Sequence, residues 1–183
     1  SNLNLRGFYA HFLMQNVRPN DYKQCRDFVF VSLKDYDKYD VYSLCIAAWV
    51  HYYQARENRD LTPKGIEERK KNFHKAAELY ERVLQHDPLC AYAAQGLAII
   101  TADDALGTLY GVFPGPPTDE NAKRTNNIRE ALEVFAKVRE SVDDGSVYMN
   151  MGHCYYARDE FDRAIESVSV CTFLSALANR EPV

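Results

Sequence analysis

Residues 76–100 read AAELYERVLQHDPLCAYAAQGLAII, and this stretch decides the fold. Ala76, Tyr80 and Val83 follow one another at spacings of four and three residues. That spacing puts three apolar side chains on one face of a helix. Pro88 ends this helix and begins the next, because a proline in the first helical turn loses no hydrogen bond. The stretch therefore predicts two consecutive helices with an apolar contact between them.

The small, large and medium order of Ala76, Tyr80 and Val83 recurs at two later places. The residues that repeat it are Ala131, Phe135 and Val138, followed by Ala164, Val168 and Cys171. The first recurrence lies 55 residues after the original pattern, and the second lies 33 residues further on. A period of about 34 residues is typical of stacked helix pairs, so the first interval is about 21 residues too long. The Gly- and Pro-rich segment of residues 103–126 is the predicted insertion, and residues 111–124 are expected to be its most mobile part.

A second pattern marks the first helix of each pair. Tyr148, Met151, Gly152 and Tyr155 match the W-x2-L-G-x2-Y signature with conservative changes. The small residue at position 152 lets two helices cross closely. Earlier in the chain the same slots hold Ala94, Leu97, Ala98 and Thr101, and before them Leu44, Ala47, Ala48 and His51.

Four stretches carry a resemblance to a known family. They are AAELYERVLQHDPLCAYAAQGLAII, REALEVFAKVRES, VYMNMGHCYYARDEFDRAIES and DVYSLCIAAW. Over residues 25–167 they resemble tetratricopeptide repeat proteins, and within these the large tetratricopeptide subunits of the PAF complex, an RNA polymerase II elongation factor. The resemblance implies a nuclear scaffold that binds other PAF complex components and RNA polymerase II machinery. It also implies a role in transcription elongation and transcription-coupled histone modification, without catalysis.

These features predict an all-α, tetratricopeptide-repeat right-handed superhelical solenoid with one Gly/Pro-rich insertion. Residues 1–183 are expected to form a single domain, a fragment of a longer protein with no secretory leader. The α-α helix pairs are predicted at residues of about 3–35, 41–86, 89–140 and 146–178. Thr62 precedes Pro63, so Thr62 is predicted to cap the helix that begins there. The tail of residues 168–183 lacks the charged outer face of a repeat helix. The tail can therefore be a docking surface, a cap of the repeat array, or a sequence truncated out of its context.

The composition disfavours several classes of function. The chain of 183 residues carries 22 Lys and Arg against 26 Asp and Glu, a formal net charge of −4, so direct sequence-specific binding of nucleic acid is not expected. Its five cysteines include no CxxC pair, as expected of reduced thiols inside a cell. No apolar run approaches the ~20 residues of a membrane helix, so no membrane partner is expected either.

No group of residues indicates catalysis or cofactor binding. His86 with Cys90, and His153 with Cys154, are scattered over repeat helices and do not supply the four close ligands of a structural zinc site. The sequence contains no phosphate-binding loop, no GxSxG elbow and no HExxH motif. We therefore expect a protein that is not an enzyme, with no cofactor, no bound metal and no small-molecule substrate.

The first helix of each pair in such repeats lines a groove, and helical spacing identifies the predicted groove residues. They are Tyr42, Trp49, Tyr52, Tyr92, Gln95, Ile99, Met149, His153 and Tyr156, together with Cys45, Ala102 and Ser146. None of them is Lys or Arg, whereas co-chaperone tetratricopeptide domains hold a terminal carboxylate with such donors. An apolar or extended protein segment is therefore the favoured ligand.

Other interpretations of this stripe stay open. Its aromatic side chains can simply pack within the repeat array. A co-chaperone-type adaptor and a regulatory domain of a larger enzyme are the alternative functions.

Overall fold

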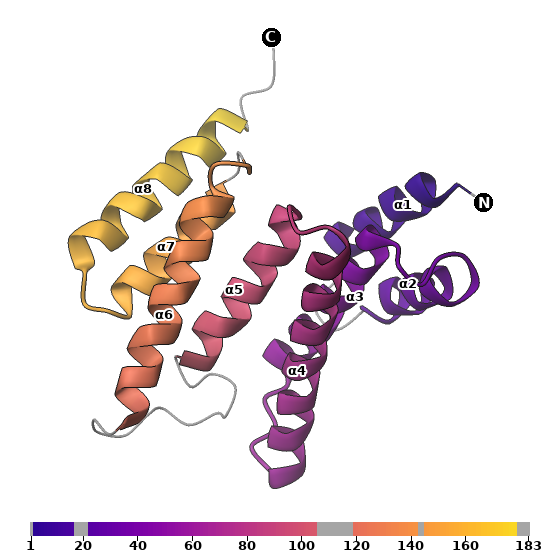
Figure 1. The fold of residues 1–183 in the computed structure, drawn as a ribbon, viewed down its shortest axis with the longest axis horizontal. Coiled ribbons are helices and arrows are strands. Elements are labelled where there is room, and N and C mark those ends of the chain that lie inside the picture. Colours follow the sequence, from indigo (N-terminus) through magenta and orange to yellow (C-terminus); the bar gives the residue numbers. More distant parts are fainter. Residues whose placement is uncertain (1, 17–21, 106–118, 143–144, 179–183) are drawn as a thin grey trace. The chain divides into compact units, whose positions relative to one another are not determined.

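The structure of this chain is a computed structural model that describes residues 2–16, 22–105, 119–142 and 145–178. Every regular element in these ranges is an α-helix, in agreement with the predicted all-α tetratricopeptide-repeat class (Figure 1). The helices are α1 (Leu3–Asn16), α2 (Lys23–Asp35), α3 (Val41–Glu57), α4 (Pro63–His86), α5 (Ala91–Ala105), α6 (Asp119–Val138), α7 (Gly145–Tyr156) and α8 (Phe161–Ala178). Their contacts divide the chain into two compact units, with the boundary inside α5 between Leu97 and Ala98.

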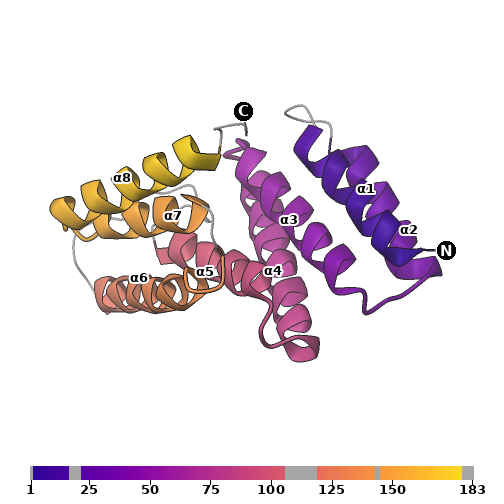
Figure 2. The ribbon, with the colours of Figure 1, turned by 90° about the horizontal axis from the view of Figure 1, so that it is seen from above.

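Consecutive helices pack as pairs within each unit. In the first unit α1 contacts α2 and α3 contacts α4, and in the second unit α7 contacts α8 (Figures 1 and 2). Further contacts join α2 to α3 and α6 to α7. Each unit therefore contains two kinds of contact: one inside a pair, and one between the second helix of a pair and the first helix of the next. We call the second kind the pair-to-pair junction.

The second helices of the pairs bury the small, large and medium residues. In α4 and α6 none of the following is more than 5% exposed: Ala76, Tyr80, Val83, Ala131, Phe135 and Val138. In α8 Ala164 and Cys171 are also buried, but Val168 is 38% exposed. Val168 lies at the same repeat position as Phe135, but part of its side chain is open to solvent.

A fourth set of the same kind lies on α2. Cys25, Val29 and Ser32 have the spacing of four and three residues, and each is at most 1% exposed. This set could not be recognised from the sequence, because Ser32 occupies a position where the other helices have an apolar residue. The serine hydroxyl is satisfied inside the core: it accepts from Arg6 Nε at 2.9 Å and donates to the Phe28 carbonyl oxygen at 3.0 Å.

The same arginine joins α1 to α2 through aromatic contacts. The guanidinium carbon of Arg6 lies 4.3 Å from the centre of the Phe28 ring and 4.2 Å from that of Tyr36. A guanidinium between two rings combines cation–π attraction with burial of its apolar faces. Tyr9 adds an edge-to-face contact with Phe28 at 4.9 Å between ring centres. α1 is therefore a folded part of the first unit and not a loose extension.

The start of α4 is fixed by side-chain bonds to the backbone. The Thr62 hydroxyl accepts from the Gly65 N–H at 3.2 Å, which confirms the predicted cap. Arg69 is 6% exposed, and its guanidinium donates to the carbonyl oxygens of Asn58 at 3.0 Å and Asp60 at 3.1 Å. Gly65 has no room for a β-carbon, because Asp60 occupies that space. These contacts hold the connection between α3 and α4 against the first turns of α4.

The predicted insertion is shorter than its expected limits of 103–126. α5 extends to Ala105 and α6 begins at Asp119, so both edges of the predicted insertion are helical. In α6, Asn126 Nδ2 donates to Glu130 Oε1 at 2.6 Å and Arg129 donates to Asn126 Oδ1 at 2.7 Å. Such i, i+3 and i, i+4 pairs support a helix where glycine and proline do not interrupt it. The expectation of mobility for residues 111–124 falls mainly outside the described residues.

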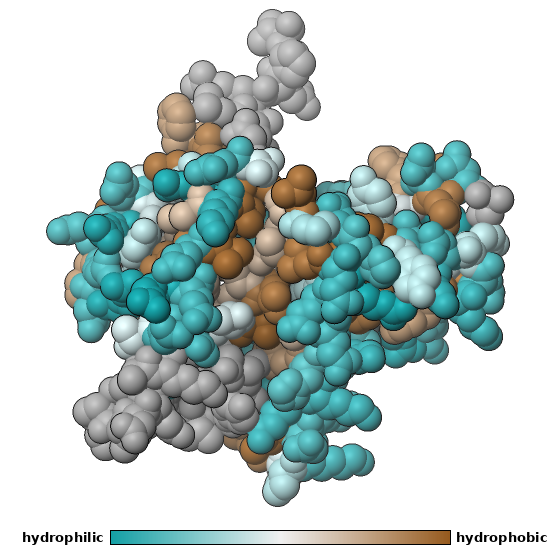
Figure 3. All heavy atoms as spheres, viewed as in Figure 1, coloured by the Kyte–Doolittle hydropathy of each residue, from teal (hydrophilic) through white to brown (hydrophobic). Residues whose placement is uncertain are grey.

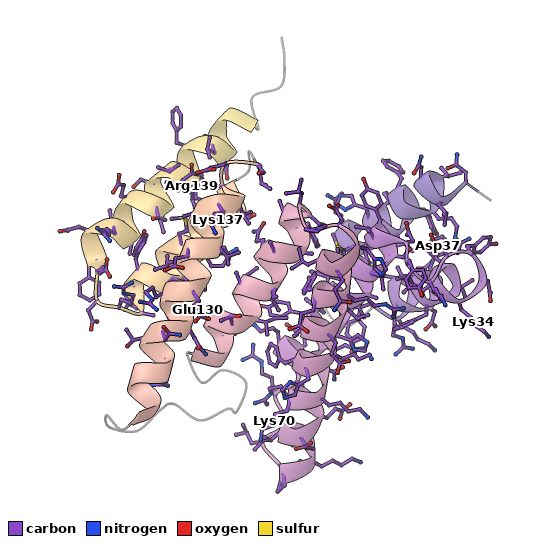
Figure 4. All side chains as sticks on the ribbon, viewed as in Figure 1. Lys34, Asp37, Lys70, Glu130, Lys137 and Arg139 are labelled. Carbon is purple, nitrogen blue, oxygen red and sulfur yellow. The ribbon has the colours of Figure 1, made fainter. Side chains whose placement is uncertain are left out.

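Unlike Arg6 and Arg69, many charged side chains lie on exposed faces of the helices. Figure 3 shows hydrophilic residues over the exposed side of α4. Figure 4 shows Lys34 in the last turn of α2 with Asp37 just beyond it, Lys70 on α4, and Glu130 and Lys137 on α6 with Arg139 directly after it. Acidic and basic groups alternate along these helices, as they do at Lys75–Glu78 and Arg129–Glu133. This mixture is typical of a solvated helix surface.

The turn between α7 and α8 uses a left-handed backbone conformation. Asp159 has a φ of 60°, a region where aspartate is tolerated better than most residues other than glycine. The carboxylate of Glu160 binds Arg158 Nε at 2.8 Å and Arg163 Nη1 at 3.0 Å on either side of this turn. The tight turn brings α8 back along α7.

Gly152 lies where these two helices cross. A β-carbon added there would meet Val168 Cγ2 at 3.0 Å and the Ala164 carbonyl oxygen at 3.4 Å. The distance to Val168 is shorter than ordinary van der Waals contact, and the distance to the Ala164 oxygen lies at the lower limit of that range. By comparison, a β-carbon on Gly7 of α1 would meet Tyr42 Cβ at 3.6 Å, which is an ordinary contact.

We predict that Gly152→Leu lowers the free energy of unfolding by about 1 to 3 kcal/mol, because the crossing cannot accept the added volume. The better helix propensity of leucine offsets part of this loss. Gly7→Ala is the matched control and should leave the stability unchanged or raise it slightly. Urea unfolding followed by circular dichroism measures both, and an unchanged midpoint for Gly152→Leu would show that this crossing is not close-packed.

His51 connects three helices of the first unit and is kept neutral by its surroundings. Its Nδ1 lies 2.9 Å from Asn72 Oδ1 of α4, and its ring meets Phe30 of α2 at 6.1 Å between ring centres. Burial lowers the pKa of His51 below its ordinary value, and the nearby cations Lys75 and Arg26 lower it further, against the opposing effect of the hydrogen bond to the Asn72 amide oxygen. The unfolded chain therefore binds a proton at this histidine more readily than the folded chain does.

The folded protein should consequently lose stability as the pH falls below about 6.5, the ordinary histidine value, towards the lower pKa of folded His51. His51→Gln removes this group, so its loss of stability between pH 7.5 and pH 5.5 should be smaller than that of the unchanged protein. Urea unfolding at the two pH values measures the difference. Equal losses in both proteins would contradict the prediction, whatever their absolute stabilities.

Candidate protein-binding surfaces

The predicted groove residues of the first unit lie on α3 and on the start of α5. Tyr42 is 68% exposed and Tyr92 is 44% exposed, while Trp49, Tyr52 and Gln95 are half-buried. The spacing of α3 and α5 residues thus brings aromatic side chains to the surface of this unit. Tyr42 is the most accessible of them.

Tyr92 also contributes to the packing of the first unit. Its hydroxyl donates to Met14 Sδ of α1 at 3.9 Å. Burial raises the pKa of Tyr92 to about 12, with a smaller contribution from the neighbouring Cys45. Loss of this side chain would therefore remove an internal contact as well as exposed surface.

The other aromatic residues of α3 are held by their neighbours. Trp49 stacks on Tyr53 with 5.2 Å between ring centres. Tyr52 meets the buried ring of Phe73 edge-on at 5.8 Å, and the Arg56 guanidinium lies 6.0 Å from the Tyr52 ring. Although the stripe contains no Lys or Arg, Arg56 therefore brings a cation to its edge. These rings form a fixed aromatic surface with one charge beside it.

The predicted groove residues of the second unit lie on the end of α5 and on α7. Ile99 and Met149 are half-buried, His153 is exposed, and Tyr156 is 67% exposed. The Tyr156 ring meets the ring of Phe161 edge-on at 5.6 Å, which holds both aromatic side chains at the α7–α8 turn. This unit therefore presents its own apolar surface, which includes the exposed side chain of Tyr156.

Two positions of the stripe are buried, contrary to the expectation that all of them face outward. Cys45 is 6% exposed and Ala102 is 7% exposed, whereas Ser146 is exposed. Small side chains at the edge of a helical stripe are covered by larger neighbours, so spacing alone overestimates the accessible surface. The Cys45 thiol interacts with Cys90, and burial together with this neighbour raises the pKa of Cys45.

The described residues do not assemble a reactive or metal-binding centre. Burial raises the pKa of Cys25 and of Cys154 to about 11, so both remain protonated thiols at neutral pH. No group of three or more His, Cys, Asp or Glu residues in the described ranges could hold a metal ion. Within the same ranges, every helix is too short or too polar to cross a membrane.

We predict that one of the five thiols reacts first when the folded protein is treated with iodoacetamide at pH 8. Cys90 should be that residue, because it is partly exposed while the other four cysteines are buried. Mass spectrometry of tryptic peptides at increasing times measures the order of modification. Fast modification of Cys25 or Cys154 would contradict the burial described here.

The described part of the chain stacks helix pairs, buries small, large and medium residues at repeated spacings and has a small residue at the α7–α8 crossing. These features define the tetratricopeptide-repeat fold, and this chain has that fold. It resembles the RNA polymerase-associated protein CTR9 of Saccharomyces cerevisiae, with 32% identity over 168 residues, 91% of this chain and 14% of the relative. It also resembles Tetratricopeptide repeat protein 1 of Schizosaccharomyces pombe, with 30% identity over 166 residues, 90% of this chain and 14% of the relative. No family model matches the chain. The chain thus spans about one seventh of the length of either relative.

Proposed function

We propose that this protein is a non-enzymatic interaction scaffold that acts in the nucleus, within a PAF-type complex that serves RNA polymerase II during elongation and histone modification. The carrying observation is the similarity to CTR9, whose name describes an RNA polymerase-associated protein, over 91% of this chain. The partners are other protein subunits of that complex. Nucleic acid is contacted through those subunits, since the chain has a net charge of −4.

The ligand of the groove residues is an extended, largely apolar protein segment. Each unit offers an accessible tyrosine on a first helix, Tyr42 at 68% and Tyr156 at 67% exposure, with further apolar surface beside it. Aromatic side chains of this kind give large contact area for little loss of conformational freedom, which is why they are enriched among the strongest contacts of protein interfaces. The groove residues of the first unit and those of the second unit each contact the ligand separately.

The chemistry disfavours capture of a terminal carboxylate by a co-chaperone-type clamp. Such capture needs several charge-assisted donors around the anion. The predicted groove residues include no Lys or Arg, and Arg56 beside Tyr52 is a single cation on one side of the stripe. An apolar segment fits the first unit better.

The test combines partner identification with point variants. Tyr42→Ala and Tyr156→Ala should each weaken binding of an isolated PAF-complex subunit by about 1 kcal/mol or more in calorimetry. Thermal unfolding should change little, because both side chains are mostly exposed. Tyr92→Ala should lower both affinity and stability, since its hydroxyl also contacts Met14.

Leu89→Ala is the control, because Leu89 is 91% exposed and lies outside the stripe. It should bind like the unchanged protein. Normal binding by both Tyr42→Ala and Tyr156→Ala would contradict the groove proposal. The protein can also be used as bait to purify its partners from nuclei. The proposed complex would be contradicted if a chaperone came down in place of elongation subunits, or if the chain proved to be a domain of a larger enzyme.

A further inference from the structure

Two thiols of the first unit lie in contact with each other. Cys45 lies near the start of α3, and Cys90 lies directly before Ala91, the first residue of α5. Their side chains share a hydrogen bond, although the whole of α4 separates them in the sequence. A hydrogen bond between thiols brings the two sulfur atoms close together. A disulfide between two cysteines requires this kind of approach.

The backbone holds both cysteines at fixed positions. The Asp40 carboxylate caps α3 just ahead of Cys45. At α5, the Cys90 N–H donates to the Asp87 carbonyl oxygen at 3.1 Å, and the Cys90 carbonyl oxygen accepts from the Ala94 N–H at 3.1 Å. The contact between the thiols is therefore set by the starts of two helices.

Two tyrosines interact with both thiols and belong to the same cluster. Burial raises the pKa of Tyr80 well above its ordinary value, and Cys45 and Cys90 each add to this effect. Burial also raises the pKa of Tyr92 to about 12, with further contributions that include the same two thiols. Tyr80 lies on α4 and fills the space beside Gly96 of α5. The cluster thus joins α3, α4 and the start of α5.

The two thiols differ in accessibility. Cys90 is partly exposed, whereas Cys45 is only 6% exposed. Burial raises the pKa of Cys45 above its ordinary value, and the neighbouring Cys90 adds to this effect, so Cys45 stays a protonated thiol at neutral pH. A reagent in solution therefore meets Cys90 first, and Cys45 is the second sulfur already in contact with Cys90.

We propose that Cys90 and Cys45 are a reversible oxidation site that closes to a disulfide when the protein meets glutathione disulfide. The Cys90 thiolate attacks one sulfur of glutathione disulfide, so a mixed disulfide forms and one glutathione thiolate leaves. The Cys45 sulfur then attacks the Cys90 sulfur, and the second glutathione leaves with the proton of Cys45. The two cysteines lose two electrons and two protons, and one glutathione disulfide becomes two glutathione thiols.

The disulfide joins α3 to the start of α5 and closes the chain around α4. Such a link restricts the unfolded chain and therefore stabilises the folded protein. Reduced glutathione returns the pair to thiols, so the link forms only while the oxidant is in excess. This chemistry needs only the two cysteines and is independent of the proposed complex and of its partners.

The test treats the full, folded chain with glutathione disulfide at about pH 8 and then blocks free thiols with iodoacetamide. Mass spectrometry of tryptic peptides should find a peptide pair linked through Cys45 and Cys90, and dithiothreitol should return both residues to free thiols. The same treatment in concentrated urea should link cysteines without this preference, because unfolding separates the two sulfur atoms. The linked protein should unfold at a temperature about 5 °C or more above that of the reduced protein.

Variants separate the two steps of the reaction. Cys45→Ala should stop at a lasting mixed disulfide on Cys90, and Cys90→Ala should leave Cys45 unmodified. Cys171→Ser is the matched control and should form the link like the unchanged protein, since Cys171 lies in the second unit and is the least buried of the other three cysteines at 9% exposure.

The peptide assay on the unchanged protein does not depend on the folding of any variant. The proposal is overturned if that protein forms no link between Cys45 and Cys90 while folded, or if it retains glutathione on Cys90. It is also overturned if the linked protein unfolds at no higher temperature than the reduced one, because the native contact would then not accommodate the bond.

Discussion

The pair-to-pair junction is the contact on which the rest of this structure depends. A helix pair cannot bury all of its own apolar surface, so the second helix needs the first helix of the next pair. Tyr80 shows how closely the two must fit: it is 4% exposed, and its ring occupies the space where a β-carbon on Gly96 of α5 would lie. Full burial of a side chain of this size contributes about 1.5 to 3 kcal/mol. A glycine in the neighbouring helix makes that burial possible.

The fold could be predicted from the sequence wherever residue type alone marks a buried position. Ala76, Tyr80 and Val83 and their two recurrences identify helices α4, α6 and α8, and Pro63 and Thr62 identify where α4 begins. The set on α2 could not be found in this way, because burial of Ser32 depends on its bonds to Arg6 and Phe28. The glycine and proline residues also led to predicted insertion limits of 103–126 that are too wide, because the helices on either side extend into this range.

The candidate surfaces were harder to predict than the core, for a related reason. Helical spacing predicts the face of the helix on which a side chain lies, but not which neighbouring side chains cover it. Tyr42 and Tyr156 are exposed in their units, yet Cys45 and Ala102 are covered and Tyr92 reaches Met14 of α1. It also could not foresee Arg56, one turn beyond Tyr52, as a charge at the edge of the stripe. The surface proposed for partner binding is accordingly smaller than the full stripe.

The most direct test of the account compares the same repeat position with and without a following helix among the described residues of this chain. Leu132 on α6 and Ile165 on α8 are equivalent and similar in volume, but they are 8% and 66% exposed. Urea unfolding in dilute solution should show that Leu132→Ala lowers the free energy of unfolding by about 2 to 5 kcal/mol. Ile165→Ala should change it by no more than about 0.5 kcal/mol. Equal losses at the two positions would contradict the claim that the following pair determines which repeat positions form the core.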